Sequence, residues 1–180
     1  MKIEKTSIKD LYIIEPEIFF DSRGYFFESF NSKSYNEILD GVNFVQDNFS
    51  KSTKGVLRGL HFQRNNPQGK LVQVTKGLVF DVAIDLRFNS KTFGQWHGVE
   101  LSEENKKQFW IPEGFAHGFQ VLSNEAHFQY KCTNFYDPHD DNTLLWSDPS
   151  LDIKWKNQKK ILSDKDKNGC LLNSIAPIKI

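Results

Sequence analysis

The chain has 180 residues, a length typical of one domain, and its 23 Lys and Arg balance its 23 Asp and Glu. This balance excludes a basic field that would hold nucleic acid and an acidic disordered tail. No apolar run approaches the roughly 18 residues that span a bilayer, and Met1–Asp10 carries no export signal. We therefore expect one cytoplasmic domain over residues 1–180, with neither a nucleic-acid nor a membrane partner.

The predicted secondary structure begins with a helix over residues 32–39, where Tyr35, Ile38 and Leu39 recur at helical spacing behind a Ser or Asn cap. After it, short runs of β-branched and aromatic residues alternate with turn residues, which is typical of an all-β sandwich or barrel. The expected elements are a strand over 56–63, a hairpin over 70–87 with Gly77 in its turn, strands over 95–101, 108–111, 118–122 and 127–135, one helical turn over 103–107, and a solvated loop over 154–168.

The second strand of that hairpin places carboxylates among apolar residues. Alternate residues of a strand point to opposite sides, so Val79, Asp81, Ala83 and Asp85 share one side. If this side lines a barrel, Asp81 is a buried carboxylate that needs partners or a function. Parity equally allows a solvated side, and both interpretations stay open.

The segment over residues 55–63 places Arg58 and His61 inside an otherwise apolar strand. Their opposite parity keeps them apart on an ideal strand, so a bulge near Gly59 is required if both face one pocket. A lone strand histidine is more often a structural residue than a catalyst, so this segment alone does not predict an active site.

Five histidines suggest a metal site, but their spacing does not support one. A metal-binding cupin presents two His two positions apart and then a Glu, whereas here Gln63 follows His61 at that spacing. His117 supplies at most one more imidazole, which falls short of the usual ligand set, and we predict no metal. Cys132 and Cys170 match neither a disulfide framework nor a zinc knuckle, and we expect both to be reduced and buried.

Two further residues have structural explanations of their own. Ser163 and Asp166 have the spacing of a capping box, which would make Asp166 a helix N-terminal carboxylate. Tyr130 lies in an aromatic strand and reads as a core tyrosine with its hydroxyl at the rim. Only the combination of these residues points to a function.

That combination consists of segments that occur in order along almost the whole chain. They are Phe20–Glu28, Val45–Asn48, Val56–Gln63, Gln68–Leu71, Phe80–Asp85, Thr92–Trp96, Ile111–Phe119, Tyr130–Thr133 and Leu162–Asp166. Together they closely resemble the dTDP-4-dehydrorhamnose 3,5-epimerase family, which acts in dTDP-L-rhamnose biosynthesis.

The resemblance implies a cupin jelly-roll β-barrel with a few short helices. It also implies a homodimer that exchanges N-terminal strands, and no metal or organic cofactor. The implied reaction converts dTDP-4-dehydro-6-deoxy-D-glucose to dTDP-4-dehydro-L-rhamnose, with inversion at C3 and C5 through an enolate. A carbon acid beside a ketone needs a base, a group that holds the enolate oxygen, and an acid across the ring.

The resemblance assigns these roles to named residues. His61 matches the family's base, and an imidazole, with an unperturbed pKa of about 6.5, suits this task at neutral pH. Asp166 matches the carboxylate that orients this base, as in a catalytic triad. Tyr130 matches the acid, and Lys70 matches the residue near the ketone oxygen.

The same resemblance implies a binding site for the nucleotide. The corresponding residues are Arg23 and Arg58 for the diphosphate, Glu28, Gln46 and Asn48 near the base and the diphosphate, and His117 and Asp81 lining the barrel. Planar guanidinium groups suit phosphate oxygens. Arg23 and Glu28 are expected to reach the neighbouring subunit's site.

Several alternatives remain at this point. A relative could invert one carbon only, or use another nucleotide sugar, and a ketoisomerase on the same barrel is disfavoured by the presence of both Lys70 and Tyr130. A sugar-nucleotide-binding cupin without turnover would not need His61 paired with Asp166. A metal-dependent cupin is the most distant alternative.

Overall fold

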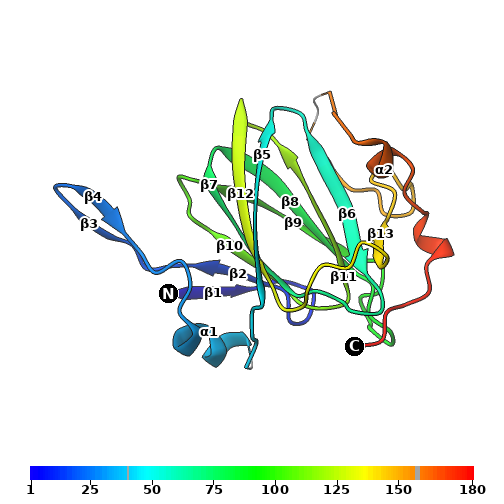
Figure 1. Ribbon diagram of the computed structural model, residues 1–180, viewed down its shortest axis with the longest axis horizontal. Coiled ribbons are helices and arrows are strands. Elements are labelled where there is room, and N and C mark those ends of the chain that lie inside the picture. Colours follow the sequence, from blue (N-terminus) through cyan, green and yellow to red (C-terminus); the bar gives the residue numbers. More distant parts are fainter. Residues whose placement is uncertain (40, 157–158) are drawn as a thin grey trace.

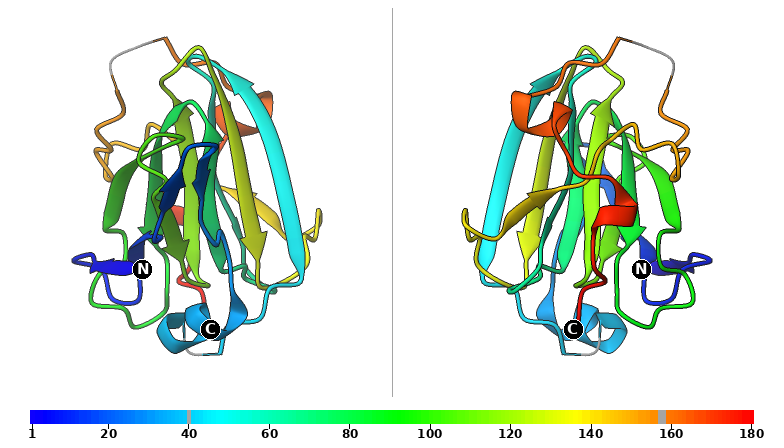
Figure 2. Two further views of the ribbon diagram at one scale, coloured as in Figure 1. Left: turned by 90° about the vertical axis from the view of Figure 1, so that its left-hand side faces the viewer. Right: turned by 90° about the vertical axis from the view of Figure 1, so that its right-hand side faces the viewer.

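The computed structural model describes residues 1–39, 41–156 and 159–180, and two antiparallel sheets face each other in it (Figures 1 and 2). In spatial order the six-stranded sheet contains β1 (Lys2–Lys5), β2 (Tyr12–Glu15), β10 (Gln108–Ile111), β7 (Lys70–Lys76), β12 (Glu125–Cys132) and β5 (Gln46–Thr53). The five-stranded sheet contains β13 (Asp141–Thr143), β6 (Leu57–Gln63), β11 (Phe115–Val121), β8 (Leu78–Asp85) and β9 (Trp96–Ser102). The remaining elements are the ribbon of β3 (Phe19–Asp21) and β4 (Gly24–Phe26), helices α1 (Ser32–Leu39) and α2 (Asp164–Lys167), and the 3₁₀ helix η1 (Leu172–Ser174).

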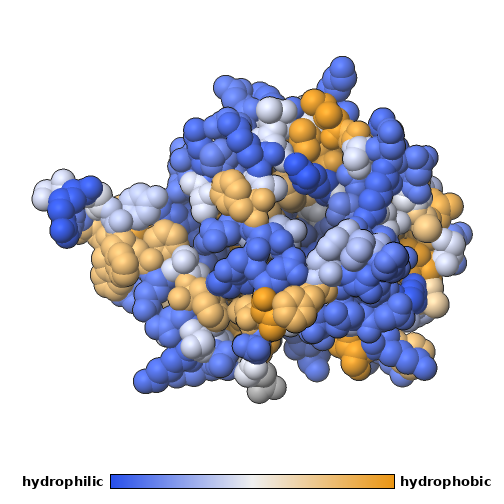
Figure 3. Space-filling model, viewed as in Figure 1, coloured by the Kyte–Doolittle hydropathy of each residue, from blue (hydrophilic) through white to orange (hydrophobic). Residues whose placement is uncertain are grey.

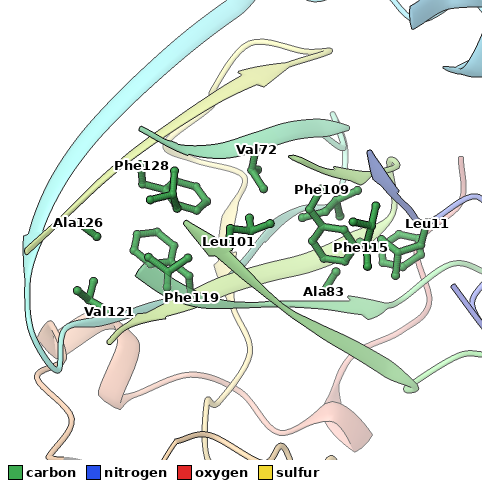
Figure 4. Close-up of a cluster of buried hydrophobic side chains, with 14 of the residues drawn as sticks. Leu11, Val72, Ala83, Leu101, Phe109, Phe115, Phe119, Val121, Ala126 and Phe128 are labelled. Atoms are coloured by element: carbon green, nitrogen blue, oxygen red, sulfur yellow. The ribbon is translucent and has the colours of Figure 1, made fainter. Parts of the chain in front are cut away.

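The main core lies between the two sheets and contains residues from both (Figure 4). Phe128 of the six-stranded sheet stacks on Phe119 of the five-stranded sheet, with ring centroids 4.2 Å apart. Val79 and Ala83 of β8 belong to this cluster, so the side of β8 that carries Asp81 faces the barrel interior. The solvated alternative for this side is therefore wrong.

Part of the outer face of each sheet is also covered. Tyr35 and Leu39 of α1 pack on Ile14, Leu71 and Trp110 of the six-stranded sheet. The C-terminal segment covers the outer face of the five-stranded sheet through apolar residues that include Leu151, Trp155, Leu172 and Ile178. β8 therefore buries both of its sides, which explains why it is apolar on the side opposite Asp81 as well.

The all-β prediction is confirmed, and so is the helix over residues 32–39. The Asn31 side chain accepts a hydrogen bond from the Lys33 amide, so Asn is the capping residue. None of the helices in the described residues is long and apolar enough to cross a membrane.

The predicted hairpin over residues 70–87 is wrong. β7 pairs with β10 and β12, whereas β8 pairs with β9 and β11, so the two strands belong to opposite sheets. Gly77, with a φ of 80°, turns the chain at the corner between them. A Cβ there would lie 2.1 Å from the Glu125 carbonyl oxygen, so this tight corner requires glycine.

Three smaller expectations also need correction. Residues 103–107 form a turn and no helix, with a positive φ at Lys106. The expected loop over 154–168 contains α2 with a buried Asp166, although residues 157 and 158 lie outside the described residues. Cys132 is buried as expected, but Cys170 is exposed, because only its backbone joins Leu144 in an isolated bridge.

Candidate active site

A cavity of about 310 Å³ lies between the two sheets. One wall of the cavity belongs to the five-stranded sheet and the opposite wall to the six-stranded sheet. The lining residues are Asn48, Phe49, Ser50, Arg58, His61, Lys70, His117, Gly118, Phe119, Phe128 and Tyr130.

His61 and Asp166 meet at this cavity although 105 residues separate them in the chain. The His61 Nε2 lies 2.6 Å from the Asp166 Oδ1. The Ser163 hydroxyl donates to the other carboxylate oxygen at 2.8 Å. Burial alone would raise the pKa of Asp166, but the hydrogen bonds from His61 and Ser163 outweigh burial and lower it. An ionised Asp166 accepts the Nε2 proton of His61 and leaves Nδ1 free as a base.

The capping-box interpretation of Asp166 holds only for its backbone. The Asp166 amide donates to the Ser163 Oγ at 3.1 Å, so Ser163 caps α2. The Asp166 side chain instead points to His61, and only 5% of it is exposed. The Asp166 backbone therefore takes part in the helix cap, while its side chain completes the pair with His61.

The predicted bulge in β6 is confirmed. His61 pairs with His117 and Arg58 pairs with Phe119, so three steps along β6 match two steps along β11. This extra residue places Arg58 and His61 on the same side despite their opposite parity. Gly59 permits the bulge: its φ is 109°, and a Cβ would lie 2.6 Å from the Gly118 Cα.

Lys70 and Tyr130 lie on the other wall, on adjacent strands of the six-stranded sheet. Burial raises the pKa of Tyr130 to about 12, so its hydroxyl stays protonated at neutral pH and can act as an acid. Burial lowers the pKa of Lys70, although the nearby Cys132, Asp141 and Asp81 counteract this effect. The wall therefore offers a hydroxyl proton and an ammonium to a ligand opposite His61.

A second histidine and carboxylate pair lies deeper in the barrel. The His117 Nε2 lies 3.0 and 2.9 Å from the two carboxylate oxygens of Asp81. Asp81 is fully buried, and burial raises its pKa even though His117 acts in the opposite direction. This pair satisfies the partner requirement that the sequence pattern indicated for a buried Asp81.

The residues expected to bind the nucleotide divide into two groups in this single chain. Arg58 and Asn48 line the cavity, and the Arg58 Nε donates to the Ser52 hydroxyl at 3.0 Å. Gln46 lies beside the cavity and donates to the Asn48 side chain at 3.0 Å.

Arg23 and Glu28 do not join the cavity of their own chain. Arg23 lies at the tip of the projecting β3–β4 ribbon, where its side chain is 86% exposed and binds Asp21 (Figure 1). Glu28 follows this ribbon and accepts a hydrogen bond from Asn31. Phe20 and Phe26 of the ribbon are 74% and 66% exposed, and apolar surface is visible there (Figure 3).

Sequence reasoning did not find Asp141, whose negative charge acts to raise the pKa of Lys70 and the pKa of Tyr130. Its carboxylate binds the Tyr136 hydroxyl at 2.8 Å and the Lys165 ammonium. Asp141 lies in a short polar segment without an alternating pattern of apolar residues, so the sequence does not indicate where its side chain lies. Its position near His61 becomes evident only from the pairing of β13 with β6. The sequence analysis also did not predict that the aromatic rings of Phe119 and Phe128 line the cavity.

Among the described residues, no three His, Cys, Asp or Glu side chains lie close enough together to hold a metal ion. Both cavity histidines instead use Nε2 to bind a carboxylate. A base on one wall, with an acid and a cation on the other, can remove a proton from a carbon beside a carbonyl and return one to the opposite face.

Comparisons with known proteins agree with this geometry. The family model described as dTDP-4-dehydrorhamnose 3,5-epimerase matches residues 5–174. A dTDP-4-dehydrorhamnose 3,5-epimerase from Shigella flexneri is 58% identical over 171 residues, which cover 94% of each chain. A crystal structure of RmlC, a dTDP-6-deoxy-D-glucose-3,5-epimerase from Legionella pneumophila in complex with dTDP-4-keto-L-rhamnose, is 56% identical with a TM-score of 0.94. It covers 97% of this chain and 94% of its own.

A more distant structure is informative because its activity differs. ChmJ, a 3'-monoepimerase from Streptomyces bikiniensis in complex with dTDP-quinovose, is 31% identical with a TM-score of 0.88. It covers 94% of this chain and 87% of its own. The shared architecture is the cupin jelly roll, and it accommodates both single and double epimerases.

Proposed function

Because the chain belongs to the dTDP-4-dehydrorhamnose 3,5-epimerase family, we propose that it converts dTDP-4-dehydro-6-deoxy-D-glucose to dTDP-4-dehydro-L-rhamnose. The observation that carries this proposal is the His61–Asp166 pair on one wall of a cavity whose other wall holds Lys70 and Tyr130. We further propose that residues 1–180 act as one domain, because the cavity draws on strands from both sheets and on α2.

The proposed mechanism follows from the positions of the groups. His61 removes the proton from the carbon beside the ketone, and Asp166 stabilises the resulting imidazolium. The Lys70 ammonium stabilises the negative charge that develops on the ketone oxygen. Tyr130 returns a proton from the opposite wall, which inverts the carbon. His61 then releases its proton to water and Tyr130 takes one up from water, after which the same steps at the carbon on the other side of the ketone complete the double epimerisation.

Binding energy for this chemistry would come from the nucleotide. Arg58 lines the cavity and presents a guanidinium suited to a diphosphate. Asn48 adds amide groups nearby, supported by Gln46.

We also propose a homodimer in which the β3–β4 ribbon of each chain carries Arg23 and Glu28 to the partner's cavity. The ribbon projects from the barrel, and its exposed aromatic rings are typical of a surface that becomes covered (Figure 3). A cation at its tip suits the diphosphate of a bound nucleotide.

The test is proton NMR in D₂O with dTDP-4-dehydro-6-deoxy-D-glucose. Deuterium entry at both C3 and C5, with formation of dTDP-4-dehydro-L-rhamnose, supports the proposal. Exchange at one carbon only would show that the chain is a single epimerase, as ChmJ is. No exchange with dTDP-, GDP- or CDP-linked 4-keto sugars would favour a binding protein without turnover.

A further inference from the structure

Three glutamines form a row across the outer face of the six-stranded sheet. Gln108 of β10 and Gln129 of β12 each lie opposite Gln73 of β7, and opposite residues of antiparallel strands point to the same side. Their chain neighbours Val72 and Phe128 belong to the main core, so the row faces outward. The Gln108 Nε2 donates to the Gln73 Oε1 at 3.1 Å, and the Gln73 Nε2 donates to the Gln129 Oε1 at 3.2 Å.

Gln108 is the buried end of this row, and it holds the stem of the β3–β4 ribbon. Only 1% of Gln108 is exposed, and its Nε2 also donates to the Ser29 carbonyl at 2.7 Å. The Tyr35 hydroxyl of α1 donates to the Gln108 Oε1 at 2.6 Å. Burial raises the pKa of Tyr35 to about 12, so this hydroxyl stays protonated. The contacts with Tyr35 and Gln73 fix the orientation of the Gln108 amide, and this orientation presents Nε2 to Ser29.

Gln108 lies where both legs of the ribbon meet the barrel. Ile14 of β2 lies opposite Gln108, and β2 ends one residue later, on the way to β3. The other leg returns from β4 through Ser29. β3 and β4 form a two-stranded sheet of their own, and the Lys106 ammonium, 4.2 Å from the Tyr25 ring centroid, contacts the ribbon on an exposed side chain. Gln108 thus provides a buried contact that sets the direction in which the ribbon leaves the barrel.

We propose that Gln108 is a positioning residue that acts across the dimer: it aims the ribbon of its own chain, and with it Arg23 and Glu28, at the partner's cavity. This inference rests on the proposed function and on the proposed homodimer. A ribbon that is already held in its docking direction loses less conformational freedom when it docks, so its groups bind the nucleotide more tightly. Loss of the Gln108 contact should therefore raise KM more than it lowers kcat.

An effect within one chain is the main competing explanation. β10 also pairs with β7, in a register that places Ile111 opposite Lys70, so a disturbed β10 would act on the cavity of its own chain through Lys70. Such an effect falls on the chain that carries the substitution. The proposed effect falls on the partner's cavity, so the two explanations predict opposite results in mixed dimers.

The experiment places Gln108→Met in one chain of a dimer that has a single active cavity. His61→Asn silences the cavity of the chain that carries it, and coexpression with two affinity tags isolates the mixed dimers. In the first arrangement, a Gln108→Met chain pairs with a His61→Asn chain, so the active cavity receives an intact ribbon. In the second, an unmodified chain pairs with a chain that carries both substitutions, so the active cavity receives the altered ribbon.

We expect the first arrangement to match a reference dimer of unmodified and His61→Asn chains. The second should show a kcat/KM roughly 5-fold lower, mainly through the KM for dTDP-4-dehydro-6-deoxy-D-glucose. Gln120→Met is the matched control, because Gln120 is also buried but lies on the five-stranded sheet, where its amide binds the Lys156 backbone. It should leave kcat/KM unchanged in both arrangements.

A loss in the first arrangement alone, equal losses in both, or no loss in either would overturn the inference, and so would a failure of the chains to form mixed dimers. If Gln108→Met does not fold, Tyr35→Phe decides through the same two arrangements, because it removes the hydroxyl that orients the Gln108 amide but keeps the ring that packs on Phe30. Failure of the proposed function has a different signature, because the unmodified protein would then form no product.

Discussion

His61 and His117 each bind a carboxylate, but they differ in access to the cavity. The His61 side chain is 33% exposed and its partner Asp166 is 5% exposed. For His117 and Asp81 the values are 9% and 0%. A base must reach its substrate while the residue that orients it stays fixed, and only His61 meets both conditions.

Replacement of His61 by Asn should lower exchange of both sugar protons at least about 10²-fold, because the general base is lost. NMR in D₂O measures this loss, and circular dichroism checks that the fold persists. His139→Asn, at an exposed position, is the control. Near-normal turnover of His61→Asn would contradict the assigned mechanism.

Tyr130→Phe should separate proton removal from inversion. His61 still removes the proton in this variant, but the far wall has no acid, so deuterium enters the sugar without full inversion. Comparison of exchange rates with product formation tests this outcome. If both rates fall equally, Tyr130 positions the substrate and does not protonate it.

Lys70 should set the alkaline limit of activity. Burial lowers its pKa below the ordinary value of 10.5, so the ammonium is lost, and kcat/KM falls, at a pH below that value. Tyr130, with a pKa of about 12, titrates later. In Lys70→Arg the decline should move to higher pH, and an unchanged decline would assign it to another group.

At the scale of elements, the bulge in β6 brings Arg58 and His61 to one cavity. At the bulge the backbones of β6 and β11 come so close at Gly59 and Gly118 that neither position has room for a Cβ. The bulge therefore requires glycine at both positions. The site thus depends on two residues that have no side chains.

Gly59→Ala tests this dependence. The new Cβ meets backbone atoms 2.6 Å away, so the strands must separate. We expect the unfolding free energy to fall by at least about 2 kcal/mol, and we expect activity to fall as well. Gly41→Ala is the matched control: Gly41 also has a positive φ, but no atom lies within 4 Å of its Cβ position. Urea unfolding compares the two, and equal stability would show that the bulge tolerates a side chain.

The hairpin error illustrates what local patterns omit. The run over residues 70–87 alternates as two strands joined at a glycine, and this pattern is the same whether the strands pair or separate. Here β7 and β8 belong to opposite sheets and each buries residues in the main core, while Gly77 forms the corner between them. Pairing was decided by other strands of the fold: β7 pairs with β10 and β12, and β8 pairs with β9 and β11.

At the scale of the whole molecule, the projecting ribbon predicts a site shared between chains. A mixture of Arg23→Ala and His61→Asn chains should regain activity, because a mixed dimer contains one cavity with His61 and an incoming Arg23. Random pairing would rebuild about a quarter of the sites. Coexpression with two affinity tags isolates the mixed dimers for assay.

The control for this experiment combines His61→Asn with Asp166→Asn, residues that meet within one chain. Their mixed dimers should stay inactive. Mixed dimers of Arg23→Ala and His61→Asn without regained activity would show that the ribbon does not complete the partner's cavity.

The sequence alone determined the all-β class and the helix over residues 32–39, since these follow from local periodicity and residue type. Parity grouped Asp81 with Val79 and Ala83 but did not decide whether that side is buried, which the structure shows. The order of motifs in the sequence identified the family. Only the tertiary structure decided that Asp166 reaches His61 across 105 residues, that β7 and β8 belong to opposite sheets, and that Asp141 lies on the strand beside the one that carries His61. The reason is physical: periodicity records which side of an element is buried, whereas the partner that buries it is chosen by packing of the whole chain.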